Sequence, residues 1–159
     1  MKRIPLGSTV CCIVSGITGV AITETVQING NVRYDIQPKS EDGKSLPEAW
    51  AVDLQSLEVV GPGISARATK PRKHTIKNGD KVQDMITGHE GVVTDISTYI
   101  NGCVFAQVVP RKTDKTILVD TAPPGSLMPV ERLKVIGEGL KVQAEDKPTG
   151  GPSMRAVRV

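Results

Sequence analysis

The segment Asn78-Gly-Asp-Lys-Val-Gln-Asp-Met-Ile-Thr-Gly-His-Glu-Gly-Val-Val93 contains a Gly-x-x-Gly turn and belongs to a part of the chain in which apolar residues recur with a period of two. This period predicts strands rather than helices, and the glycines predict a tight turn between them. The same order occurs earlier in the chain, because Gly7–Pro38 aligns with Gly79–Pro110 without a gap. Ten of the aligned positions are identical, four of them glycines. This self-similarity indicates an internal duplication.

The duplication also predicts how the chain is divided. Beyond Pro38 and Pro110 the second copy carries a longer insertion, and the copies realign at Leu57-Glu-Val-Val-Gly-Pro-Gly63 and Leu133-Lys-Val-Ile-Gly-Glu-Gly139. We therefore predict a first module over residues 6–63, a linker over 64–77, a second module over 78–139 and a C-terminal tail over 140–159.

Each module is predicted to contain five short strands. In the first module, strand one is expected over Thr9–Ser15, with Val10, Cys12 and Val14 on one face, and strand two over about 20–28. The turns between strands are assigned to Gly16, Gly19, Asn29 and Gly30, and in the second module to Gly88, Gly91, Asn101 and Gly102. Five such strands with glycine turns predict a small closed or partly open barrel, so the chain is expected to be all-β.

The first Asn-Gly pair carries a more detailed prediction. A two-residue loop would place Val26 and Ile28 on the face opposite Val32 and Tyr34. A three-residue bulged loop places all four side chains on one face, and we expect this loop.

The segment Asn78–Val93 resembles the opening of SH3-like barrels of the KOW type, in which an apolar strand, a Gly-x-x-Gly turn and a Val-rich strand follow one another. The resemblance extends to both modules. It implies two tandem small SH3-like barrels joined by a basic linker.

A narrower pattern also links the chain to a class of proteins. Gly-Asp-x-Val-x-Asp-x-Ile-Thr-Gly-x-x-Gly-Val-Val, followed by Tyr99-Ile-Asn-Gly-Cys103 and a strand ending in Pro110, is similar to small structural proteins of tailed bacteriophages. Trp50–Val60 closes the first module in the same style. The resemblance implies a non-enzymatic virion protein in a large symmetric assembly, with other virion structural proteins as partners. A capsid decoration or cement protein, binding neighbouring major capsid subunits, is the leading prediction, and a neck or tail connector is the alternative.

The charge is distributed unevenly along the chain. The first module carries −4 and the second −2, whereas the linker carries +5 and no acidic residue. We predict that the linker contacts an acidic partner surface through Arg67, Lys70, Arg72, Lys73 and Lys77. A solvated linker is the plain alternative. A KOW-type nucleic-acid or ribosome-binding module would place these residues on phosphates, but the acidic modules and the few aromatic residues argue against direct nucleic-acid contact.

Two further segments are candidates for partner contact. Trp50 is expected either to cap the open end of the first barrel or to anchor a partner, since tryptophans are enriched in interface hot spots. The end of the tail is expected to add as a strand to an adjacent subunit, through Met154, Arg155, Val157, Arg158 and Val159.

Residue types that carry chemistry are scattered. Cys11 and Cys12 are adjacent on a strand and therefore point to opposite faces. His89-Glu90 is the only adjacent acid–base pair, and it is expected in an exposed turn. The sequence predicts no catalytic residue, no metal site, no cofactor and no membrane segment.

Overall fold

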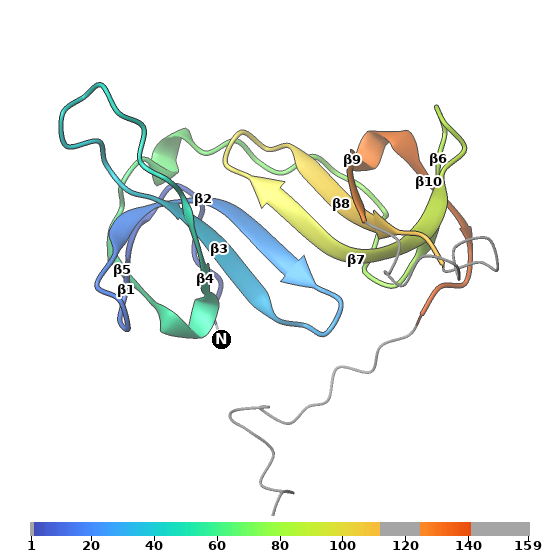
Figure 1. Cartoon of the computed structure of the whole chain (residues 1–159), viewed down its shortest axis with the longest axis horizontal. Coiled ribbons are helices and arrows are strands. Elements are labelled where there is room, and N and C mark those ends of the chain that lie inside the picture. The colour runs from blue at the N-terminus through green and yellow to red at the C-terminus, as the bar shows by residue number, and fades with distance from the viewer. Residues whose placement is uncertain (1, 112–124, 141–159) are drawn as a thin grey trace, which may run out of the picture.

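The computed structural model describes residues 2–111 and 125–140, which form ten antiparallel strands and three short 3-10 helices (Figure 1). The first half consists of β1 (Thr9–Cys12), β2 (Thr18–Gln27), β3 (Val32–Gln37), β4 (Trp50–Asp53), η1 (Leu54–Ser56) and β5 (Leu57–Gly61). The short helix η2 (Ser65–Arg67) lies in the linker. The second half consists of β6 (Lys81–Asp84), β7 (Glu90–Tyr99), β8 (Val104–Val109), β9 (Ser126–Pro129), η3 (Val130–Arg132) and β10 (Leu133–Gly137).

The two halves repeat one another strand for strand. The strands β1 to β5 recur in the same order as β6 to β10, and each has the same length as its counterpart. Their first residues coincide in the alignment predicted from the sequence, so the aligned positions are structurally equivalent. The predicted all-β class is confirmed.

The first strand is shorter than predicted. It ends at Cys12 instead of Ser15, because the chain turns there: the Gly16 N–H donates to the Cys12 carbonyl at 2.8 Å, and the Cys12 N–H donates to the Ile17 carbonyl at 2.8 Å. Val10 and Cys12 are buried as expected, but Val14 lies in the turn and is exposed. Its predicted place on the buried face is therefore wrong.

The hairpin between β2 and β3 has the predicted three-residue loop. The Gln27 N–H donates to the Asn31 carbonyl, and the Gly30 N–H donates to the Gln27 carbonyl with Gly30 at a φ of +86°. Val26 therefore pairs with Val32, and both belong to the cluster around Tyr34. Ile28 does not join this cluster.

The two glycines of each Gly-x-x-Gly turn have different roles. Gly16 and Gly88 adopt φ values of +76° and +77°, in the region that glycine favours. Gly19 and Gly91 have no such φ but lie against the third strand of their half. A Cβ atom at Gly19 would lie 2.5 Å from the Gln37 carbonyl oxygen, and one at Gly91 2.6 Å from that of Val109. Only the first glycine of each pair has the conformational role that we predicted.

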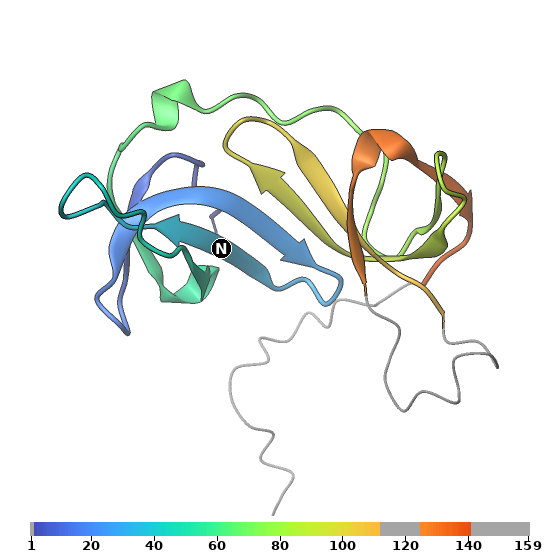
Figure 2. The ribbon, with the colours of Figure 1, turned by 45° about the horizontal axis from the view of Figure 1, so that its top comes forward.

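Within the described residues, the strands form one open sheet rather than two closed ones. The hydrogen-bonded order is β10-β6-β7-β2-β1-β5, with β3 and β4 added beyond β2 and β8 and β9 beyond β7. β4 and β5 do not pair, and η1 connects them; β9, β10 and η3 are arranged in the same way. Each half curls around its own hydrophobic cluster (Figures 1 and 2). β2 and β7 join the halves, and no pattern in the sequence predicted this pairing.

Substituting Gly19 or Gly91 with alanine should destabilise the fold, because the added methyl group has no space beside the third strand. We expect a loss of roughly 1–3 kcal/mol in the free energy of unfolding, as for other overpacked sites, measured by urea denaturation. Gly61→Ala is the matched control, since a Cβ there meets nothing closer than Thr9 at 3.9 Å. An equal loss in the control would show that strand propensity, not the close approach, sets the cost.

Candidate functional site

A symmetric seam joins the two halves at the centre of the molecule. β2 and β7 pair in antiparallel fashion from Thr23↔Tyr99 to Gln27↔Asp95, with Thr25↔Ser97 as the middle pair. Thr25 and Ser97 are equivalent positions of the two repeats, and their hydroxyl oxygens lie 2.8 Å apart. The halves are therefore related by an approximate two-fold axis through this pair. The β2–β3 and β7–β8 hairpins accordingly point in opposite directions (Figure 1).

Two β-bulges extend the seam on both sides of the axis. The registers of β2 with β3 and of β7 with β8 shift at Ile22 and Thr94, which are equivalent positions. An extra residue of this kind leaves the ladder of its own hairpin. The Ile22 carbonyl accepts the Ile100 N–H at 2.9 Å, and the Thr94 carbonyl accepts the Ile28 N–H at 2.7 Å. The same bond is thus made twice, once from each half.

The basic linker lies along the second half instead of hanging free. The Thr69 N–H donates to the Ile100 carbonyl at 2.9 Å, and the Arg72 N–H donates to the Gly102 carbonyl at 3.0 Å. The Arg72 guanidinium also pairs with Glu131 at 2.8 Å across an exposed surface. The side chains of the other predicted linker residues are exposed, namely those of Arg67, Lys70, Lys73 and Lys77. All five cations are therefore exposed, and Arg72 is already paired with Glu131.

An exposed apolar turn occurs at the same place in both halves. Ile13 and Val14 follow β1 with 58% and 81% of their surface exposed, and the equivalent Met85 and Ile86 follow β6 with 58% and 73%. The Ile13 N–H donates to the Ser56 carbonyl at 2.9 Å, and the Met85 N–H donates to the Arg132 carbonyl at 2.8 Å. Each turn is therefore fastened to the end of its 3-10 helix. The two turns lie at opposite ends of the molecule (Figures 1 and 2).

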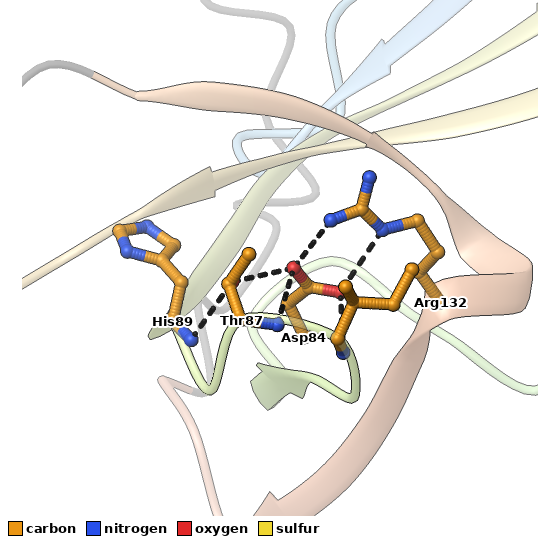
Figure 3. A network of polar contacts seen from close by, with 5 residues as sticks. Asp84, Thr87, His89 and Arg132 are labelled. Carbon is orange, nitrogen blue, oxygen red and sulfur yellow. Dashed lines mark hydrogen bonds and ion pairs between the residues drawn. The ribbon is translucent and has the colours of Figure 1, made fainter.

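The second apolar turn rests on a polar network that sequence reasoning missed (Figure 3). Asp84, at the end of β6, is fully buried. Its carboxylate accepts two hydrogen bonds from the Arg132 guanidinium, and the one from Nε measures 3.0 Å. It also accepts a hydrogen bond of 2.6 Å from the Thr87 hydroxyl. The Ile86 and Thr87 N–H groups also donate to it, each at 3.3 Å. The bonds from Arg132 and Thr87 hold the pKa of Asp84 well below its ordinary value.

The first half holds the same turn with different residues. Cys12, Ser15 and Ser56 replace Asp84, Thr87 and Arg132 at the equivalent positions. The Ser15 N–H points to the Cys12 sulfur at 3.5 Å, and Cys12 is buried. The missed signal was the position of Asp84, which shares with Val82 the buried face of an alternating strand. A carboxylate there requires partners.

The remaining predicted residues are dispersed. Trp50 lies on the edge strand β4 with 51% of its surface exposed, which does not fit the expected cap, and the partner-anchor interpretation stays a prediction. The His89 ring points away from the Asp84 carboxylate (Figure 3), and its Nε2 atom is enclosed without a hydrogen-bond partner among the described residues. Its predicted exposed position is only partly correct. The tail residues Met154, Arg155, Val157, Arg158 and Val159 lie outside the described residues.

The face of the seam that carries Thr25 and Ser97 combines charged and aromatic side chains. Asp95 pairs with Gln27 in the seam and Asp35 on β3 pairs with Thr23, and partial burial raises the pKa of both carboxyl groups. Arg33 forms an ion pair with Asp53 at 3.2 Å. Tyr99 and Phe105 meet edge to face, with ring centroids 5.4 Å apart.

An open hollow of about 330 Å³ lies between the linker and the seam. Glu24 is the acidic residue of its wall, and it is already paired with Arg3 at 3.1 Å and with the Tyr34 hydroxyl. The wall consists of Pro5, Leu6, Glu24, Ser65, Ala68, Thr69, Lys70, Pro71 and Thr98. Its one carboxylate is therefore occupied by protein partners.

Comparisons of the chain with models of protein families, with curated proteins and with solved structures give no match. Over residues 2–111 and 125–140, no three His, Cys, Asp or Glu side chains are grouped in a way that could hold a metal ion. The same part of the chain contains no helix with the length and apolar character that a membrane crossing requires.

Replacing Asp84 with asparagine should destabilise the protein in a pH-dependent way, because Arg132 loses its charged partner. The folded-state pKa of Asp84 lies below its ordinary value near 3.8, so the ion pair stabilises the fold fully above that pH and progressively less as the pH falls. Thermal unfolding from pH 7 to pH 2 should show the largest difference from wild type at neutral pH.

Cys12→Ala is the matched control at the equivalent position of the first half. It removes a buried side chain without a carboxyl group, so its cost should not vary as the pH falls through the range in which Asp84 titrates. A constant difference between Asp84→Asn and wild type would show that the carboxylate charge does not stabilise the turn.

Proposed function

We propose that this chain is a non-enzymatic structural protein of a tailed phage virion, and specifically a capsid decoration protein that bridges neighbouring capsid subunits. In this proposal each five-stranded half is a small SH3-like barrel of the KOW type. The chain is carried in the virion after assembly in the host cytoplasm.

The duplicated apolar turn is the observation that carries the proposal. Exposed apolar residues gathered in one place are typical of protein-binding surfaces. The residues differ between Ile13-Val14 and Met85-Ile86, yet both pairs are apolar, exposed and fastened to a 3-10 helix. Because the turns lie at opposite ends of a two-fold body, one chain can contact two identical subunits at once. A shell offers such pairs of subunits at its local symmetry axes.

The linker adds an electrostatic contribution in the same proposal. Arg67, Lys70, Lys73 and Lys77 present four cations along one exposed segment. An acidic surface of a neighbouring subunit fits them, and such complementarity increases the rate and specificity of association more than its affinity.

Mass spectrometry of purified particles, with capsids and tails separated, locates the chain in the virion. We expect a copy number on the order of hundreds on the capsid fraction, as a repeated shell would give. Roughly six to twelve copies on the neck or tail fraction, as ring symmetry gives, would instead identify a connector. Recovery on ribosomes or nucleic acid with a steep loss at higher salt would favour the KOW-type nucleic-acid alternative.

Paired substitutions test the two turns on capsids that lack the chain. Ile13→Ser with Val14→Ser, and separately Met85→Ser with Ile86→Ser, should each weaken binding by about 100-fold or more, because either pair converts bivalent into monovalent attachment. Leu46→Ser is the control, since Leu46 is an exposed apolar residue of a surface loop outside both turns. Unchanged binding by either double variant would show that only one turn is used.

A further inference from the structure

The seam is self-complementary at the level of the repeat. An interface between two identical units pairs each residue with its symmetry partner and places one equivalent pair on the axis. The β2–β7 register has this form, centred on Thr25 and Ser97. The bonds from Ile28 to Thr94 and from Ile100 to Ile22 are symmetry copies of one another.

The hydroxyl–hydroxyl bond on the axis can be formed by residues from either repeat. Thr25 and Ser97 both carry hydroxyl groups, and either oxygen can act as donor or acceptor in their 2.8 Å bond. A Thr–Thr or a Ser–Ser pair can make the same bond. The backbone bonds of the seam do not depend on residue identity.

Each half also has what it needs to form the seam with a unit other than its covalent neighbour. The two hydrophobic clusters share no residue, so neither half borrows core residues from the other. Among the described residues, one side-chain bond is specific to the mixed pair: the Asn78 amide donates to the Val26 carbonyl at 2.9 Å, and the equivalent of Asn78 is Leu6. The backbone bonds that Thr69 and Arg72 make to the second half are kept within that half if the chain is cut before Thr69.

We propose that the β2 and β7 edges are homotypic interaction surfaces, whose partner is a second copy of either repeat. In the intact chain the linker holds one repeat beside the other at high effective concentration, which favours the intramolecular seam. Two chains that exchange repeats form the same seam between molecules, as in domain swapping. This inference does not rest on a role in a virion.

The test divides the full chain after it has folded. A protease site is inserted between Arg67 and Ala68, so that residues 68–77 stay with the half whose hairpin they contact. After cleavage, the protein is diluted, incubated and measured by native mass spectrometry, which separates the two halves by mass. We expect the 1:1 complex as the main species, favoured by Asn78, together with dimers of the first half and dimers of the second half. Detection of the 1:1 complex alone, or of monomers alone, would overturn the proposal.

Cysteine substitutions on and off the axis test the geometry in the cleaved protein. With Thr25→Cys, two first halves place their introduced thiols opposite one another across the seam, at a cross-strand distance that a disulfide can bridge after oxidation. Thr23→Cys is the matched control, because the symmetric register places Gln27, not the second introduced thiol, opposite that position. Cleaved wild-type protein, oxidised in parallel, shows how much covalent dimer the native cysteines form by themselves. A covalent dimer of first halves with Thr25→Cys only is expected, and equal yields from the two variants would contradict a seam centred on Thr25.

Discussion

The pairing of β2 with β7 determines how the two halves of this protein are placed relative to one another. A ten-residue strand in each half is long enough to serve two neighbours on one edge, its own β1 or β6 near one end and the other long strand near the opposite end. The bulges at Ile22 and Thr94 separate the part of each long strand that pairs within its own half from the part that pairs across the seam. Each bulge lies just before the seam begins, and its carbonyl accepts a hydrogen bond from the other half. The placement of the two halves beside one another and the opposed positions of the apolar turns follow from this pairing.

The two copies have kept their backbone while changing the groups that fix it. In the second half a buried carboxylate, a guanidinium and a hydroxyl hold the turn after β6, whereas a thiol and two serines occupy these positions in the first. An ion pair with a buried carboxylate orients its partners strongly but requires both of them, because a buried charge without its partner is strongly destabilising. The Asp84–Arg132 pair therefore constrains the second turn in a way that Cys12 and Ser56 do not constrain the first.

Much of the fold could be predicted from the sequence because local chemistry specifies it. The repeat alignment, the order of strands and the three-residue loop before Val32 follow from alternation, glycine and Asn-Gly pairs. The seam could not be predicted, because backbone bonds between distant strands leave no residue signature. Val14 was misplaced because alternation continues beyond the point where the turn begins. The cap expected at Trp50 rested on its size, which suggests burial, whereas an edge strand has a side that nothing in the described chain covers.

In the candidate site, too, the sequence indicates which residues are present, whereas their positions depend on contacts between distant parts of the chain. The basic residues of the linker are evident in the sequence, but the path of the linker depends on two backbone bonds to the β7–β8 hairpin. The apolar pairs after β1 and β6 read as strand residues until the turns are seen. An exposed apolar pair in one copy is common, whereas the same exposure at equivalent positions of both copies is what supports the proposal that one chain bridges two like subunits. The β2–β7 pairing thus places the two exposed apolar turns at opposite ends of the molecule. The side-chain hydrogen bond at the centre of this pairing can be made by any two hydroxyl residues.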